Sequence, residues 1–132
     1  PARATGLRRV AARAESLATH PGDPRPLNVA GTATMLAGDP AEAAALFTTA
    51  LAAGERPELL ANLGLARAAT GDREGALAPM LRAAWISPMM APALEQRSGL
   101  PIRARLTELE NRLSAGELTV ADLPPSPVPL SD

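Results

Sequence analysis

The stretch from residue 57 to residue 88, PELLANLGLARAATGDREGALAPMLRAAWISP, contains two helix-forming segments separated by Gly71-Asp72. Ala, Leu, Arg and Glu, which all favour helices, dominate both segments. Gly71 can take the left-handed conformation after the last turn of one helix, and Asp72 can cap the start of the next. The stretch therefore predicts a helix, a tight turn and a second helix.

The same pattern occurs 33 residues earlier in the chain. The segment 31–39 matches the segment 64–72, and each begins with Gly and ends in Gly-Asp. The register extends in both directions, where Pro24, Leu27, Ala43, Phe47 and Ala50 correspond to Pro57, Leu60, Ala76, Met80 and Ala83. A tandem pair of helix–turn–helix repeats follows, which we place at 24–55 and 57–88.

The repeat carries its own packing and capping signals. Gly31 and Gly64 have no side chain, so we expect Phe47 and Met80 to pack against the helix backbone there. Ala43 and Ala76 are small, which indicates that each helix pair crosses closely at these positions. In the first repeat we expect Asp39 to cap the second helix, with Pro40 at its first position and Glu42 as a capping-box acid.

The flanking segments complete the expected organisation. Residues 1–21 carry an apolar stripe at helical spacing and are predicted to be the second helix of a partial repeat; the stripe is Leu7, Val10, Ala11, Ala14, Leu17 and Ala18. Residues 90–115 are predicted to form two capping helices, the last with one charged, wet face. Residues 117–132 are too rich in proline to be helical and predict an extended polyproline II tail. Sparse β-branched and aromatic residues complete the case for an all-α fold of about seven helices, with a solenoid at 1–116.

The second repeat resembles the tetratricopeptide (TPR) family. The landmarks of that family occur in order at Leu63-Gly64, Gly71-Asp72, Ala76, Met80, Ala83 and Pro88. The chain departs from the family at Ala30, at Leu27 and Leu60 in place of tryptophan, and at Thr34 and Arg67 in place of tyrosine. The resemblance implies a solenoid of antiparallel helix pairs that binds proteins.

Residues suited to catalysis or metal binding are scarce. There is no cysteine, and the one histidine, His20, precedes a proline in a predicted turn. Glu108 and Glu110 are two residues apart on a helix and so lie on different faces. We therefore expect no enzyme activity, cofactor or metal.

The formal net charge of −1 also argues against nucleic-acid binding. Four arginines, at positions 3, 8, 9 and 13, crowd the N-terminal helix; we favour a solvated face there over a surface for an anionic partner.

The TPR resemblance implies a concave groove lined by the first helix of each repeat, which would hold a protein or peptide partner. Carried over by position, the groove residues are Arg25, Asn28, Thr32, Met35, Asn62, Leu65 and Ala69. Some TPR domains hold a terminal carboxylate with a clamp of basic and amide residues. We do not expect that clamp here, because only Asn62 matches one of its positions. The other clamp positions are occupied by Asn28, Thr32, Ala91 and Glu95. Asn62 has two equal interpretations: a bond to water, or contact with a peptide backbone.

An apolar contact patch is the second candidate surface, formed by Trp85, Met89 and Met90. The interpretation that we favour is that the following helix or the proline tail covers Trp85. Self-association through the tail is a further expectation, because Leu123, Val128 and Leu130 give it apolar contacts.

These features predict a non-catalytic scaffold or assembly factor. The compact, Ala-rich style resembles the accessory TPR lipoprotein of tight-adherence (Flp-type) pilus systems, which implies a role in a bacterial envelope pilus or secretion system. The alternative is a regulatory TPR domain from a larger enzyme or signalling protein. We favour the periplasm or envelope over the cytoplasm, and expect no integral membrane segment because no apolar run is long enough.

Overall fold

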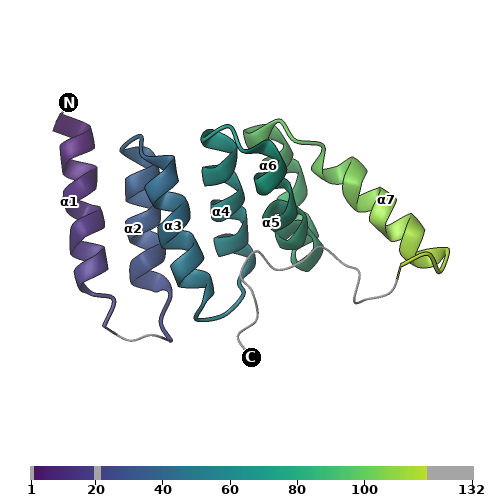
Figure 1. Ribbon diagram of the computed structural model, residues 1–132, viewed down its shortest axis with the longest axis horizontal. Coiled ribbons are helices and arrows are strands. Elements are labelled where there is room, and N and C mark those ends of the chain that lie inside the picture. The colour runs from purple at the N-terminus through teal and green to yellow at the C-terminus, as the bar shows by residue number, and fades with distance from the viewer. Residues whose placement is uncertain (1, 20–21, 119–132) are drawn as a thin grey trace.

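The computed structural model describes residues 2–19 and 22–118, and their regular secondary structure is entirely helical, without a strand (Figure 1). The helices are α1 (Ala2–Ser16), α2 (Arg25–Leu36), α3 (Pro40–Leu51), α4 (Pro57–Ala69), α5 (Arg73–Ile86), the short 3-10 helix η1 (Pro88–Met90), α6 (Ala91–Ser98) and α7 (Ile102–Ser114). The predictions of an all-α fold and of seven helices are confirmed for the described residues. His20 and the proline-rich segment 119–132 lie outside them.

The helices stand in a row, and from α1 to α5 successive helices run in alternating directions (Figure 1). Each of these helices packs mainly against its neighbours in the chain. At the other end of the row, α7 packs against α5 and α6, while α6 also contacts α4. Ile102 and Leu106 of α7 are buried, and Arg103, Arg105 and the other charged residues of the helix are exposed. This helix therefore has the one wet face that the sequence predicts.

The glycine turns are as expected. Gly38 and Gly71 adopt left-handed φ values of 92° and 89°, so each ends its helix where an L residue would be strained. Asp72 then caps α5, accepting a hydrogen bond from the backbone N–H of Gly75 at 2.9 Å.

The predicted cap at Asp39 is wrong, although Pro40 does begin α3. Asp39 makes no side-chain cap bond. The position equivalent to Gly75 is Glu42 in α3, and Glu42 lies beside Asp39. A hydrogen bond with Asp39, and then the repulsion between the two carboxylates, raises the pKa of Glu42 above its ordinary value. Gly75 leaves room for Asp72, because a Cβ at position 75 would collide with that carboxylate.

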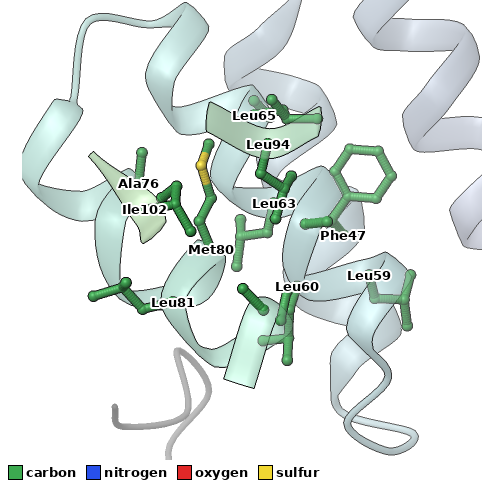
Figure 2. Packing of buried hydrophobic residues seen from close by; sticks show 14 of the residues in the cluster. Phe47, Leu59, Leu60, Leu63, Leu65, Ala76, Met80, Leu81, Leu94 and Ile102 are labelled. Atoms are coloured by element: carbon green, nitrogen blue, oxygen red, sulfur yellow. The ribbon is translucent and has the colours of Figure 1, made fainter. Parts of the chain in front are cut away.

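Glycines let large side chains of one helix reach the backbone of its partner. A Cβ built on Gly31 would lie 2.5 Å from the ring of Phe47. A Cβ built on Gly64 would collide with the side chain of Met80 and lie 3.1 Å from the carbonyl oxygen of Ala76. Figure 2 shows Phe47 and Met80 within one buried apolar cluster. The predicted packing of Phe47 and Met80 against glycine is confirmed in both repeats.

The close crossing of α4 and α5 gives the first prediction. Ala76 is fully buried and its carbonyl faces Gly64. We expect Ala76→Leu to lower the free energy of unfolding by about 1–3 kcal/mol, because the added side chain has no space between the helices. Chemical denaturation measures this loss, and a midpoint equal to that of the wild type would contradict the close crossing. Ala78→Leu, at a half-buried position of the same helix, is the control and should cost less.

Pro79 lies inside α5 and is buried. A proline has no backbone N–H, so the carbonyl of Gly75 one turn earlier loses its helical donor. The guanidinium of Arg67 on α4 donates to this carbonyl at 3.1 Å and replaces that bond. Arg67 is thus part of the α4–α5 contact, in a place that the sequence did not indicate.

Candidate protein-binding surface

Two asparagines from equivalent helices lie side by side. The side-chain amide of Asn62 on α4 donates to the side-chain oxygen of Asn28 on α2, at 3.0 Å. Both residues are half-buried, so each retains a part that solvent reaches. The repeat brings these two predicted groove residues together, because positions nearly one repeat apart occupy neighbouring first helices.

Arg25 is exposed, and its own turn fixes its orientation. Its guanidinium makes two hydrogen bonds, each of 2.9 Å, to the carboxylate of Asp23, which also accepts from the backbone N–H of Arg25. The hydrogen bond and the negative charge of Asp23 raise the pKa of Arg25 above its ordinary value. The turn therefore presents an oriented ion pair, and the sequence indicated only its cation.

The other predicted groove residues differ in accessibility. Thr32 and Ala69 are exposed, and the hydroxyl of Thr32 donates to the carbonyl oxygen of Asn28 one turn earlier, at 2.9 Å. Met35 is half-buried and packs against the core. Leu65 is only 8% exposed and belongs to the core cluster, so its assignment to an open groove is revised.

Arg56 is the residue that sequence reasoning missed. It lines an open depression of about 500 Å³ together with Gly22, Asp23, Pro24 and Arg25. It also lines a second, smaller depression of about 40 Å³ that reaches Asn28. Among the described residues, no ion pair involves Arg56. The available signal was the repeat itself. Arg56 precedes Pro57 as Asp23 precedes Pro24, at the start of each repeat.

We name this region the Asn28–Asn62 surface. It comprises Arg25, Asn28, Thr32, Arg56, Asn62 and Ala69. Its amides offer both donors and acceptors, and Arg56 offers a planar set of donors suited to a carboxylate.

The second predicted surface is partly covered. Trp85 and Met90 are half-buried and pack against the core, while Met89 is 91% exposed. Ile86, beside Trp85 in the chain, is also exposed. The predicted patch of Trp85, Met89 and Met90 stays a prediction, and the proposed cover by the tail lies outside the described residues.

Groups of three or more His, Asp or Glu that could hold a metal ion do not occur in the described part of the chain. No helix described here is both long and apolar enough to cross a membrane. Searches of protein-family models, curated proteins and solved structures found no match to this chain.

Proposed function

We propose that the chain is a TPR-like solenoid that serves as a non-catalytic scaffold or assembly factor, and that the Asn28–Asn62 surface binds an extended segment of a partner protein. The contact between Asn28 and Asn62 carries this proposal. It places two amides from equivalent helices next to each other, beside the depression that Arg56 lines.

The chemistry of the surface suits a peptide. An amide side chain can pair with both the N–H and the C=O of a peptide backbone, and the Asn28–Asn62 bond leaves several of these donors and acceptors available. Arg56 can make a bidentate contact with a carboxylate of the same partner. Three features support a TPR-like arrangement: the 33-residue register, the packing of Phe47 and Met80 against glycines, and the alternating directions of the helices. The setting that we propose, assembly of a bacterial envelope pilus or secretion system, is supported by the sequence resemblance alone.

A capture experiment tests the surface. We expect the double variant Asn62→Ala with Ala69→Glu, and separately Arg56→Glu, to weaken capture of the partner by about tenfold or more. Arg56 is exposed, so Arg56→Glu should leave the free energy of unfolding within about 0.5 kcal/mol of the wild type. The double variant loses the half-buried Asn62–Asn28 hydrogen bond and should cost no more than about 1.5 kcal/mol. The chain and its variants would be immobilised and exposed to extract of the native organism, and captured proteins quantified by mass spectrometry.

Arg105→Glu is the matched control for Arg56→Glu, because it makes the same charge change at an exposed position on α7. A partner of the Asn28–Asn62 surface is retained by this control and lost by both test variants. If every protein captured by the wild type is captured equally by the test variants, the surface does not bind a partner and the proposal fails.

A further inference from the structure

Large apolar side chains are exposed at the start of the helix row. Val10 on α1 is 49% exposed, Leu17 in the turn directly after α1 is 53% exposed, and Val29 on α2 is 50% exposed. With Ala14, Arg9 and Arg13 they line one open depression of about 370 Å³. We name these six residues the N-terminal patch. Exposed apolar clusters of this kind commonly mark interaction sites.

The repeat within the chain indicates what kind of element fits there. At intervals of 33 residues, Val10, Ala14 and Leu17 correspond to Ala43, Phe47 and Ala50 of α3 and to Ala76, Met80 and Ala83 of α5. All six of these counterparts are at most 2% exposed. The helix that precedes each of them in the chain, α2 or α4, packs on this face, with Gly31 against Phe47 and Gly64 against Met80. Val10 and Leu17 keep this face open, with no such helix over them among the described residues, whereas Ala14 is buried in a cluster with Ala30 and Ala33 of α2.

The patch differs from its two counterparts in shape. A small residue, Ala14, stands where Phe47 and Met80 project. In the inner repeats the projecting side chain requires a glycine on the covering helix. Ala14 itself is only 6% exposed and packs with Ala30 and Ala33, so the exposed apolar surface of the patch comes from Val10, Leu17 and Val29. A docked helix would bury these three side chains with apolar residues of its own.

Charge restricts the occupant further. Arg9 and Arg13 border the patch, and no ion pair in the described part of the chain involves either of them. The helix also carries Arg3 and Arg8, against a single acid, Glu15. A second copy docked through its own α1 would place the same arginines opposite one another, which is unfavourable. A helix with acidic residues beside its apolar stripe is complementary instead.

The entry into α1 differs from the entries into α3 and α5. Positions 5 and 6 correspond to the turns Gly38-Asp39 and Gly71-Asp72, through which α2 and α4 connect to the helices that they cover. In α1 these positions are Thr5 and Gly6, and the helix continues through both. The tight turn that joins a covering helix in the inner repeats is therefore not formed here.

We propose that the N-terminal patch docks an amphipathic helix of a partner protein, with large apolar residues along its stripe and acidic residues beside them. This site is distinct from the Asn28–Asn62 surface, and its test uses different variants, so either proposal can fail alone.

Two synthetic helical peptides of equal length test the proposal. Both carry leucines at helical spacing; the flanking positions are glutamate in one and lysine in the other. Fluorescence anisotropy with the full chain measures their affinities, and we expect the glutamate peptide to bind at least about tenfold more tightly. Leu17→Asp, and separately the pair Arg9→Glu with Arg13→Glu, should each weaken its binding by about tenfold or more.

Matched controls make the same chemical changes elsewhere. Leu36→Asp alters a leucine that is 57% exposed near the end of α2, and Arg97→Glu with Arg105→Glu reverses two exposed charges on α6 and α7. Both controls should leave the affinity of the glutamate peptide unchanged. Circular dichroism of each variant verifies that the changes at exposed positions leave the helices intact.

Three results would overturn the proposal. Absence of binding by both peptides excludes a helix-docking site of this chemistry. Equal binding of the lysine peptide removes the role of the arginines, and patch variants that bind as the controls do remove the role of Leu17 or of Arg9 and Arg13. A wild-type dimer in sedimentation velocity that Leu17→Asp dissociates assigns the patch to a second copy of this chain.

Discussion

Replacing Phe47 with alanine is expected to lower the free energy of unfolding by about 3–5 kcal/mol, since deletion of a buried ring leaves a cavity. Phe47 is 2% exposed and is the only phenylalanine in the chain. Its ring lies against the backbone at Gly31, so the loss removes a close contact between α2 and α3. Domains of ordinary size have about 5–15 kcal/mol of total stability, which makes this a large fraction. Urea or guanidinium denaturation gives the value.

The partner residue makes the test specific. In the wild type, Gly31→Ala should cost about 1–3 kcal/mol through collision with the ring. In the Phe47→Ala background the same change should be neutral or stabilising, because the ring is absent and alanine is favoured over glycine by about 1 kcal/mol in a helix. Gly6→Ala is the matched control: Gly6 lies within α1, nothing is within 4 Å of its added Cβ, and the change should stabilise the protein. Additive effects of the Gly31 and Phe47 substitutions would show that the two residues do not meet.

The second large effect concerns Leu65. We expect Leu65→Glu to destabilise the protein by at least the cost of Leu→Ala in a core, about 2–5 kcal/mol, because it also places a carboxylate in apolar surroundings. Leu65 is in the central core cluster with Leu63, Met80 and Leu94. Thermal unfolding followed by circular dichroism should show a clearly lower midpoint.

Ala69→Glu is the control for this substitution. Ala69 follows Leu65 by one helical turn and is exposed, so the same carboxylate there should change stability by no more than about 0.5 kcal/mol. If Leu65→Glu and Ala69→Glu unfold at the same temperature as the wild type, Leu65 faces solvent and belongs to the groove as the sequence suggested.

The burial of Leu65 illustrates where sequence reasoning ended. Seven residues of α4 are buried: Leu59, Leu60, Ala61, Leu63, Gly64, Leu65 and Ala66. A helix in the middle of the row has neighbours on several sides, and a helix that is apolar around most of its circumference is buried around most of it. Assigning one face to a groove requires an open side, and the apolar pattern of α4 alone does not identify one.

Local sequence signals were sufficient to predict the helices, their turns and the packing of Phe47 and Met80 against glycines of the neighbouring helices. Gly38 and Gly71 end helices because glycine readily adopts the positive φ that the turn requires, which is a property of the residue itself. The pairs Gly31–Phe47 and Gly64–Met80 follow from the same spacing in both repeats. Asn28 and Asn62 lie close together because they are on equivalent helices and 34 residues apart, one residue more than the 33-residue register. Each of these depends on sequence spacing within one repeat or between two adjacent ones.

Features that depend on particular side-chain neighbours required the tertiary structure. Asp39 and Asp72 looked equally suitable as helix caps in the sequence. Asp72 caps α5 because Gly75 leaves room for its carboxylate, whereas Asp39 lies beside the carboxyl group of Glu42 and makes no cap bond. Arg67 binds the carbonyl that Pro79 leaves without a donor, and Arg56 lines a depression with residues from another turn. The exposure of Val10 and Leu17 is likewise decided by whether another helix lies on them. Periodicity specifies which face of a helix is apolar, because that depends on the chain alone; which atoms meet that face depends on where the other helices pack.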